Sequence, residues 1–218
     1  MKRYPEAEAS YERALQLRPG YVEALHHRGM AKLERREWAG ALADIEGALG
    51  LDGNYAEAHN SRGNVLLKLG REEEALAAFE RALALRGNYA DALANRGEAL
   101  QRLKREEEAL ASCEAALAVE GGHAGALNNA GNVWLQRGDA GAALGYYERA
   151  LEAKPGYAVA LNNRGNALLA LNRAAEALDS FDLALESEPD YDDALNGRVI
   201  ALRDLNRHEA VPDAVARL

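Results

Sequence analysis

Asparagine is the chemistry-bearing residue that recurs most regularly in this sequence. One set of asparagines follows helical spacings of three and four along successive segments, and its members are Asn64, Asn95, Asn129, Asn132, Asn163 and Asn166. An amide side chain donates and accepts hydrogen bonds, so a row of amides matches the backbone of an extended peptide without requiring a particular sequence. The row predicts a peptide-binding surface. The alternative is that these amides hydrogen-bond neighbouring helices, a role we expect for Asn60, Asn128, Asn162 and Asn196, which lie one residue off the row.

Charged and polar residues share the predicted face with the asparagines. We place Lys68, Glu98, Arg102 and Gln136 in the same binding surface. Acidic residues dominate the first half of this face, which also carries Glu23, Glu34, Glu57 and Asp91, whereas its second half is nearly neutral. We therefore expect a ligand segment that is basic or neutral rather than acidic.

Residues that could support catalysis or metal binding are scattered. His26 and His27 are adjacent, so a helix would point them about 100° apart, which is a poor arrangement for chelation. Cys113 replaces an aromatic residue in a repeating apolar column, so a buried thiol is expected rather than a nucleophile. The Gly121-Gly122 pair lacks the lysine and hydroxyl residue of a phosphate loop. We expect a protein that is not an enzyme and that needs no cofactor or metal.

The elements that would position these residues recur with a period of 34 residues. Glycine keeps that period at Gly29, Gly63, Gly97, Gly131 and Gly165, and alanine keeps it at Ala41, Ala75, Ala109, Ala143 and Ala177. An apolar column reads Tyr11, Ile45, Phe79, Cys113, Tyr147 and Phe181. Small residues recur where two helices must approach closely, and leucines at spacings of three, four and seven form one helical stripe.

This pattern resembles the tetratricopeptide repeat, a helix, a turn and a second helix. The resemblance implies an all-α fold, an α-solenoid whose stacked repeats form a superhelix, with the first helices lining a concave groove. The asparagine row is similar to that in the repeat arm of O-linked N-acetylglucosamine transferases. One column departs from the family, because the position that usually carries leucine has arginine at Arg28, Arg62, Arg96, Arg164 and Arg198.

The spacing divides the chain, taken as one solenoid domain over 1–218, into a series of repeats. Full repeats are predicted at 22–55, 56–89, 90–123, 124–157 and 158–191, with a shortened last repeat at 192–218. Residues 4–20 match only a second helix. The chain thus starts in mid-repeat, which we interpret as a fragment start or as an exposed end used for association.

Local signals mark the ends of the predicted helices. Asn54, Asn88 and Asp190 are predicted N-caps, each followed three residues later by an acidic residue as in a capping box. Gly70 and Gly138 suit a left-handed turn between two helices, and Asn172 and Asn206 tolerate one. Arg36 and Lys104 occupy the same column and are less suited to it.

An acidic column precedes the arginine column by 16 residues. It comprises Glu12, Glu46, Glu80, Glu114, Glu148 and Asp182. We predict ion pairs between the two columns across adjacent repeats, except at Ala130, where the arginine is missing. Two independent, solvated stripes are the alternative. A partly exposed pair would contribute less than roughly 1 kcal/mol.

The overall composition limits the partners. The net charge is −9, and the longest basic cluster, 102–105, is followed directly by three glutamates, so we expect neither nucleic acid nor a membrane surface as a partner. No apolar run could span a bilayer, and one cysteine excludes an intrachain disulfide, which favours the cytoplasm. The leading hypothesis is a scaffold that binds a protein or extended peptide. The alternatives are the substrate-recognition arm of a larger enzyme, such as a glycosyltransferase, and a structural protein that forms homo-oligomers through its exposed ends.

Overall fold

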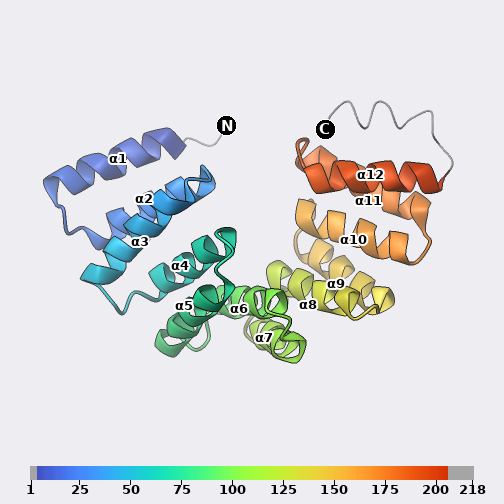
Figure 1. The fold of residues 1–218 in the computed structure, drawn as a ribbon, viewed down its shortest axis with the longest axis horizontal. Helices are drawn as coiled ribbons and strands as arrows, with labels where there is room; N and C mark the ends of the chain where they lie inside the picture. The colour runs from blue at the N-terminus through green and yellow to red at the C-terminus, as the bar shows by residue number, and fades with distance from the viewer. Residues whose placement is uncertain (1–3, 206–218) are drawn as a thin grey trace. The chain divides into compact units, whose positions relative to one another are not determined.

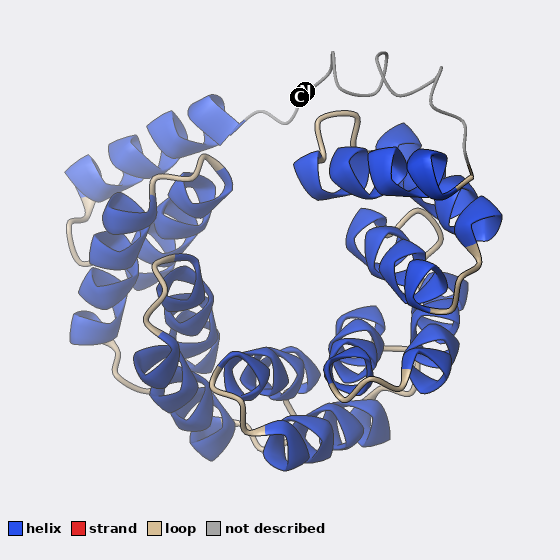
Figure 2. Cartoon of the chain, turned by 45° about the vertical axis from the view of Figure 1, so that its right-hand side comes forward, coloured by secondary structure: helices blue, strands red, loops and turns tan. Residues whose placement is uncertain are grey.

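The structure is a computed structural model that describes residues 4–205. Every regular element in that range is an α-helix, so the predicted all-α fold class is confirmed (Figures 1 and 2). The chain divides into two compact units, Met1–Val119 and Glu120–Leu218, which we call unit 1 and unit 2.

The helices alternate between first and second helices of successive helix–turn–helix pairs. Unit 1 contains α1 (Tyr4–Leu17), α2 (Val22–Glu34), α3 (Trp38–Leu51), α4 (Ala56–Lys68), α5 (Glu72–Leu85), α6 (Ala90–Arg102) and α7 (Glu106–Val119). Unit 2 contains α8 (Ala124–Gln136), α9 (Ala140–Ala153), α10 (Ala158–Ala170), α11 (Ala174–Ser187) and α12 (Asp192–Asp204). The first helices are α2, α4, α6, α8, α10 and α12. Residues 206–218 of the predicted last repeat lie outside the described residues.

A left-handed residue joins the first helix of each pair to the second. Positive φ angles occur at Arg36, Lys104 and Asn172 among the non-glycine residues, and at Gly70 and Gly138 in the same column. After each of them, a backbone N–H returns to the carbonyl five residues earlier, as when Arg71 N donates to Leu66 O over 2.9 Å. This pattern is a Schellman motif, and it satisfies carbonyls at the end of the first helix. The turn prediction is confirmed at these five positions, whereas Asn206 lies outside the described residues.

The starts of the first helices differ from the prediction. The N-cap residues are Tyr55, Tyr89 and Tyr191, one position after the predicted asparagines and aspartate, and their side chains form no capping hydrogen bond. The predicted capping boxes at these three helices are therefore wrong. Asn54 has another role, because its Oδ1 accepts a hydrogen bond from Arg81 over 3.0 Å. Tyrosine occupies the cap because its ring can be partly buried there, which the local sequence rule does not consider.

The glycine column allows a second-helix side chain to pass close to the first helix. A Cβ atom added to Gly63 would lie 2.4 Å from the Phe79 ring, and one added to Gly131 would lie 2.6 Å from the Tyr147 ring. The side chain facing Gly97 is Cys113, which is completely buried, and burial raises the pKa of its thiol to about 12. The expectation of a buried thiol at this position is confirmed.

The predicted acid–arginine pairs form at three positions. Arg62 Nε lies 3.0 Å from a Glu46 carboxylate oxygen, and Glu80–Arg96 and Asp182–Arg198 are also ion pairs. Arg28 instead donates from Nε to Asp44 over 2.7 Å, because an aspartate on the following helix competes with the predicted partner Glu12.

Arg164 breaks the arginine column. Its Nε is buried and has no hydrogen-bond partner in the described part of the chain, although Glu148 occupies the expected column.

Candidate functional site

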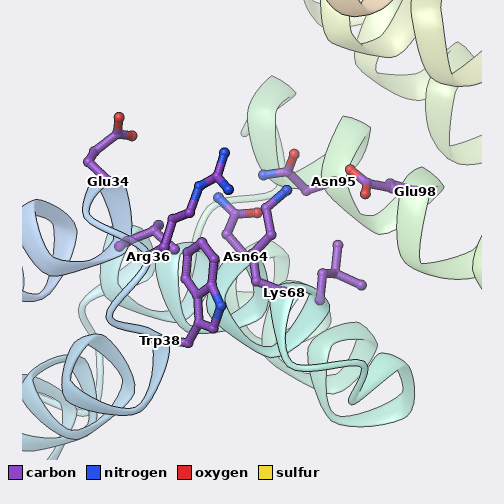
Figure 3. A pocket seen from close by; sticks show the side chains of 9 residues that line it. Glu34, Arg36, Trp38, Asn64, Lys68, Asn95 and Glu98 are labelled. Carbon is purple, nitrogen blue, oxygen red and sulfur yellow. The ribbon is translucent and has the colours of Figure 1, made fainter. Parts of the chain in front are cut away.

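The predicted binding residues of unit 1 gather around one cleft of about 430 Å³ (Figure 3). Its lining comprises Leu33, Glu34, Arg36, Trp38, Asn64, Leu67, Lys68, Asn95 and Glu98. These residues come from the end of α2, the turn after it, the start of α3, and the two following first helices, α4 and α6. Four of them belong to the predicted set. A fifth predicted residue, Arg102, donates hydrogen bonds to Glu98 and to the Leu67 carbonyl at the edge of the cleft.

Arg36, Trp38 and Leu33 are cleft residues that the sequence analysis missed. Figure 3 shows Arg36 and Asn64 beside the Trp38 indole, with Asn95 and Glu98 coming from the neighbouring helix. Helical spacing within the first helix could not find Arg36 and Trp38, because one lies in the turn and the other starts the second helix. The available signal was Trp38 itself, one of only two tryptophans in the chain.

Two of the five acidic residues of this face are paired with arginines. Glu98 pairs with Arg102 at 2.7 Å. Glu57 pairs with Arg86, and the hydrogen bond from that guanidinium is the main reason why the pKa of Glu57 is lowered. Lys68 forms no ion pair within residues 4–205. The face is therefore less acidic than its sequence suggests.

The asparagines of unit 1 divide into two kinds. Asn95 on α6 donates from Nδ2 to Asn60 Oδ1 on α4 over 3.0 Å, so it links neighbouring first helices. The prediction of inter-helix bonding is confirmed for Asn60. Asn64 is half-buried, lines the cleft, and forms no side-chain hydrogen bond in the described range.

In unit 2 the predicted asparagines form a connected network. Asn163 Nδ2 on α10 lies 3.0 Å from both Asn128 Oδ1 and Asn132 Oδ1 on α8. Asn132 Oδ1 also accepts a hydrogen bond from the Tyr147 hydroxyl over 2.8 Å. Asn129 is buried beside this network. These amides tie helices together, and the inter-helix prediction is confirmed for Asn128.

The remaining members of the asparagine columns in unit 2 behave differently. Asn166 and Gln136 are exposed, so both can reach a ligand. Asn162 bonds only to Asn163 on its own helix, and its buried Oδ1 has no partner among the described residues, so its predicted inter-helix role is wrong. The reason is that the position 35 residues later, which supplies the donor to Asn60 and Asn128, is Gly197 here. Asn196 is exposed.

A histidine replaces asparagine at the first member of this column. His26 is buried on α2, with Nδ1 3.1 Å from the Tyr55 hydroxyl and Nε2 2.9 Å from the Ser61 hydroxyl. Desolvation is the main cause that lowers the pKa of His26 to about 4, so the imidazole is neutral at pH 7. Its contacts are those of a helix-linking residue.

The described part of the chain has neither metal-site nor membrane-spanning features. No group of three or more histidine, cysteine, aspartate or glutamate residues within 4–205 is arranged to hold a metal ion. In the same range, no helix combines the length and the apolar character required to cross a bilayer.

The chain is similar to known proteins in two respects: its sequence matches models of a repeat family, and its fold matches solved structures. Models of the tetratricopeptide repeat match residues 56–89, 95–158 and 135–198, which together cover more than half of the chain. The structure of YrrB, described as a tetratricopeptide repeat protein with an unusual peptide-binding site, is 25% identical with a TM-score of 0.55, over 86% of this chain and 97% of that chain. MamA is 25% identical with a TM-score of 0.57, over 74% of this chain and 94% of that chain.

A thermophilic tetratricopeptide repeat protein from Thermus thermophilus shows the shared fold. It is 23% identical with a TM-score of 0.75, over 84% of this chain and 98% of that chain. Curated proteins give no match to the sequence.

Proposed function

The chain belongs to the tetratricopeptide repeat family, and we propose that it is a non-catalytic scaffold that binds an extended segment of a partner protein. The binding surface is the first-helix face, defined as the face of the first helices that carries the predicted polar residues. The observation that carries this proposal is the unit 1 cleft, where Asn64, Lys68, Asn95 and Glu98 meet around one concave space. YrrB, which shares the fold and a quarter of its residues over most of the chain, has a peptide-binding site.

The chemistry of the cleft suits a peptide better than a small reactant. Asn64 offers one amide whose hydrogen-bonding groups are not used by the framework, and such a group can pair with a main-chain N–H or C=O. Leu33, Leu67 and the Trp38 ring supply apolar surface for a side chain. The polar side chains of the cleft would therefore orient a bound segment by hydrogen bonds to its main chain.

Three residues whose types could support catalysis, Cys113, His26 and Ser61, are instead buried in the framework. The raised pKa of Cys113 keeps the thiol protonated near neutral pH, and a protonated, buried thiol is a poor nucleophile. His26 and Ser61 are hydrogen-bonded to each other, but both are buried. These observations support a binding role without a reaction.

The charge that we expect for the bound segment depends on the charged side chains at the cleft and not on the net charge of the chain. Glu98 is already paired with Arg102, so it is a weaker attractant for a basic residue than its position in the sequence suggests. We propose that the ligand segment at this cleft is neutral on average, and that it is held by main-chain hydrogen bonds and one apolar side chain.

The test uses a displayed library of random 12-residue peptides selected against the whole chain. Enriched peptides are then measured by fluorescence anisotropy against a variant carrying Asn64→Ala and Lys68→Ala. We expect this variant to bind at least about tenfold more weakly, because it loses two polar contacts worth roughly 1 kcal/mol each. Asn95 is left unchanged, since it bonds to Asn60 and its loss would disturb the framework.

Two further variants define the surface. Asn88→Ala is the matched control, because Asn88 is exposed in the loop before α6 and does not line the cleft. A double variant with Gln136→Ala and Asn166→Ala tests the first-helix face of unit 2. If all three variants bind the enriched peptides as tightly as the unchanged chain, the first-helix face is not the binding surface.

A further inference from the structure

We propose that unit 2 carries a second protein-binding site, away from its asparagine network, in a cleft of about 410 Å³ formed by α9, the loop that follows it, α10 and α11. Its ligand is a protein segment with a leucine-sized apolar side chain flanked by one acidic and one basic residue. The cleft is lined by Leu151, Pro155, Gly156, Leu161, Arg164, Leu183, Glu186 and Ser187.

Arg164 provides the first observation. In the same column, Arg62, Arg96 and Arg198 each direct Nε to the acidic residue 16 positions earlier. Arg164 Nε is instead buried without a partner in the described range, and the residue lines the cleft. A buried N–H without an acceptor is costly, so the Arg164 guanidinium is not satisfied by the framework in the way that its counterparts are.

The corresponding position in unit 1 provides the second observation. There, 102 residues earlier, polar contacts bridge the corresponding parts of α4, α5 and the loop after α3. Arg81 donates to Asn54 Oδ1 over 3.0 Å, and His59 Nε2 lies 3.0 Å from the Gly53 carbonyl.

Two leucines and a glycine in unit 2 replace the bridging side chains of unit 1. Arg81 corresponds to Leu183, His59 to Leu161, and Asn54 to Gly156. Neither leucine can form the bridging hydrogen bonds, so an apolar cleft stays open at this position. Leu183 is 43% exposed, so its side chain is accessible to a ligand in this cleft.

The lining determines the ligand chemistry. Three leucines supply apolar surface for an aliphatic side chain, and the Arg164 guanidinium on the same lining is best complemented by a carboxylate. Glu186 is exposed on the same lining, and its counterpart in unit 1 is Ala84. A basic residue on the other side of the apolar side chain would pair with this carboxylate. Charge complementarity therefore favours an acidic–apolar–basic segment.

The test selects a displayed library of random 12-residue peptides against the whole chain in which Asn64 and Lys68 are already alanine, so that selection at the proposed first-helix site is weakened. Recovered peptides are measured by fluorescence anisotropy against three added changes. Leu183→Arg introduces the arginine that unit 1 has at the corresponding position. Arg164→Leu introduces the leucine that is usual in the family. Ile200→Arg is the control. Ile200 is an exposed aliphatic residue on α12 that does not line the cleft.

We expect recovered peptides to carry the acidic–apolar–basic pattern. Both Leu183→Arg and Arg164→Leu should weaken their binding at least about tenfold, while Ile200→Arg leaves it unchanged. Circular dichroism is recorded for each variant, and because Arg164→Leu removes an unpaired buried donor, it should fold at least as stably as the parent. The proposal is overturned if no peptide is enriched, if the peptides lack an acidic residue, or if Ile200→Arg weakens binding equally. Dodecanoate, a small lipophilic acid, is titrated against the same chain in parallel. If it binds while no peptide is enriched, the cleft is a site for a small lipophilic acid and the proposal is also overturned.

This site and the first-helix site fail independently. Loss of peptide binding with the Asn64 and Lys68 changes concerns only the first-helix face, whereas the effects of Leu183→Arg and Arg164→Leu concern only the cleft of unit 2.

Discussion

Asn64 in unit 1 and Asn132 in unit 2 occupy the same repeat column but have opposite roles. Asn132 accepts hydrogen bonds from the Tyr147 hydroxyl and from Asn163, so its carbonyl belongs to the framework. In unit 1 the column of Tyr147 carries Phe79, which has no hydroxyl to donate, and Asn64 lines the cleft. The presence of the tyrosine hydroxyl, which phenylalanine lacks, thus accompanies the change from an asparagine that lines a cleft to one that is hydrogen-bonded within the framework.

The two units also link their first helices through different chemistry. Unit 1 uses the His26 imidazole with Ser61, followed by the Asn95 amide with Asn60, whereas unit 2 uses the amides of Asn163 and Asn128. All these pairs are 35 residues apart. The repeat therefore fixes where neighbouring helices meet, and the residue type at that point decides whether the link responds to pH.

The largest expected effect concerns the apolar column of the second helices, which carries Tyr147 in unit 2 and Cys113 in unit 1. Tyr147→Ala should lower the free energy of unfolding by about 3–5 kcal/mol, because it leaves a large cavity, whereas Cys113→Ala should cost about 1 kcal/mol. Urea unfolding followed by tryptophan fluorescence measures both, since Trp38 reports on unit 1 and Trp134, which packs near Tyr147, reports on unit 2. Equal losses for the two variants would contradict the structure.

The second prediction concerns pH. The pKa of His26 is lowered to about 4, so the unfolded chain binds a proton near pH 6.5 whereas the folded chain does not. Stability is therefore lost as the pH falls from 6.5 to 4, by about 2–3 kcal/mol at this residue. His26→Asn introduces the asparagine that other repeats have in this column. Between pH 6.5 and 4, its loss in the free energy of unfolding should be smaller by about 2–3 kcal/mol. Identical pH profiles of unfolding for the two proteins would show that His26 is not the group responsible.

A smaller effect separates two asparagines of unit 2. Asn128→Leu should cost about 1–2 kcal/mol, because it leaves the amide of Asn163 with fewer acceptors and removes a buried hydrogen bond. Asn162→Leu should be neutral to within about 0.5 kcal/mol, since losing the long 3.3 Å hydrogen bond from its amide to Asn163 is offset by removing a buried carbonyl oxygen that has no partner in the described range. Thermal unfolding by circular dichroism distinguishes them, and a larger loss for Asn162→Leu would mean that its carbonyl has a partner after all.

The smallest expected effect is at the turns. Lys104→Gly should raise stability by about 0.5–1 kcal/mol, because Lys104 has a φ of 62° and glycine adopts that conformation without strain. Gly70→Ala, at the equivalent turn, should lower stability by about 1 kcal/mol for the same reason. Urea midpoints of the two variants should therefore move in opposite directions.

Short-range signals predicted the turns well and the helix starts poorly. The left-handed residue was predictable because one position per repeat must reverse the chain, and five described positions have that geometry. The capping residues were not, because an asparagine before a tyrosine looks like a cap, while the partly buried tyrosine ring holds the capping position. Three acid–arginine pairs followed from spacing alone, but Arg28 pairs with Asp44 on the following helix instead of Glu12 on the preceding one.

The sequence by itself determined the repeat period, the helical class and the face on which polar residues recur, because these follow from spacing along one chain. The tertiary structure decided which amides are free for a ligand, since that depends on groups brought together from other helices, such as the Tyr147 hydroxyl at Asn132. It also decided that Arg36 and Trp38 line the unit 1 cleft and that Arg164 Nε is buried without an acceptor from residues 4–205. A period places a residue on a face, but only packing determines its neighbours.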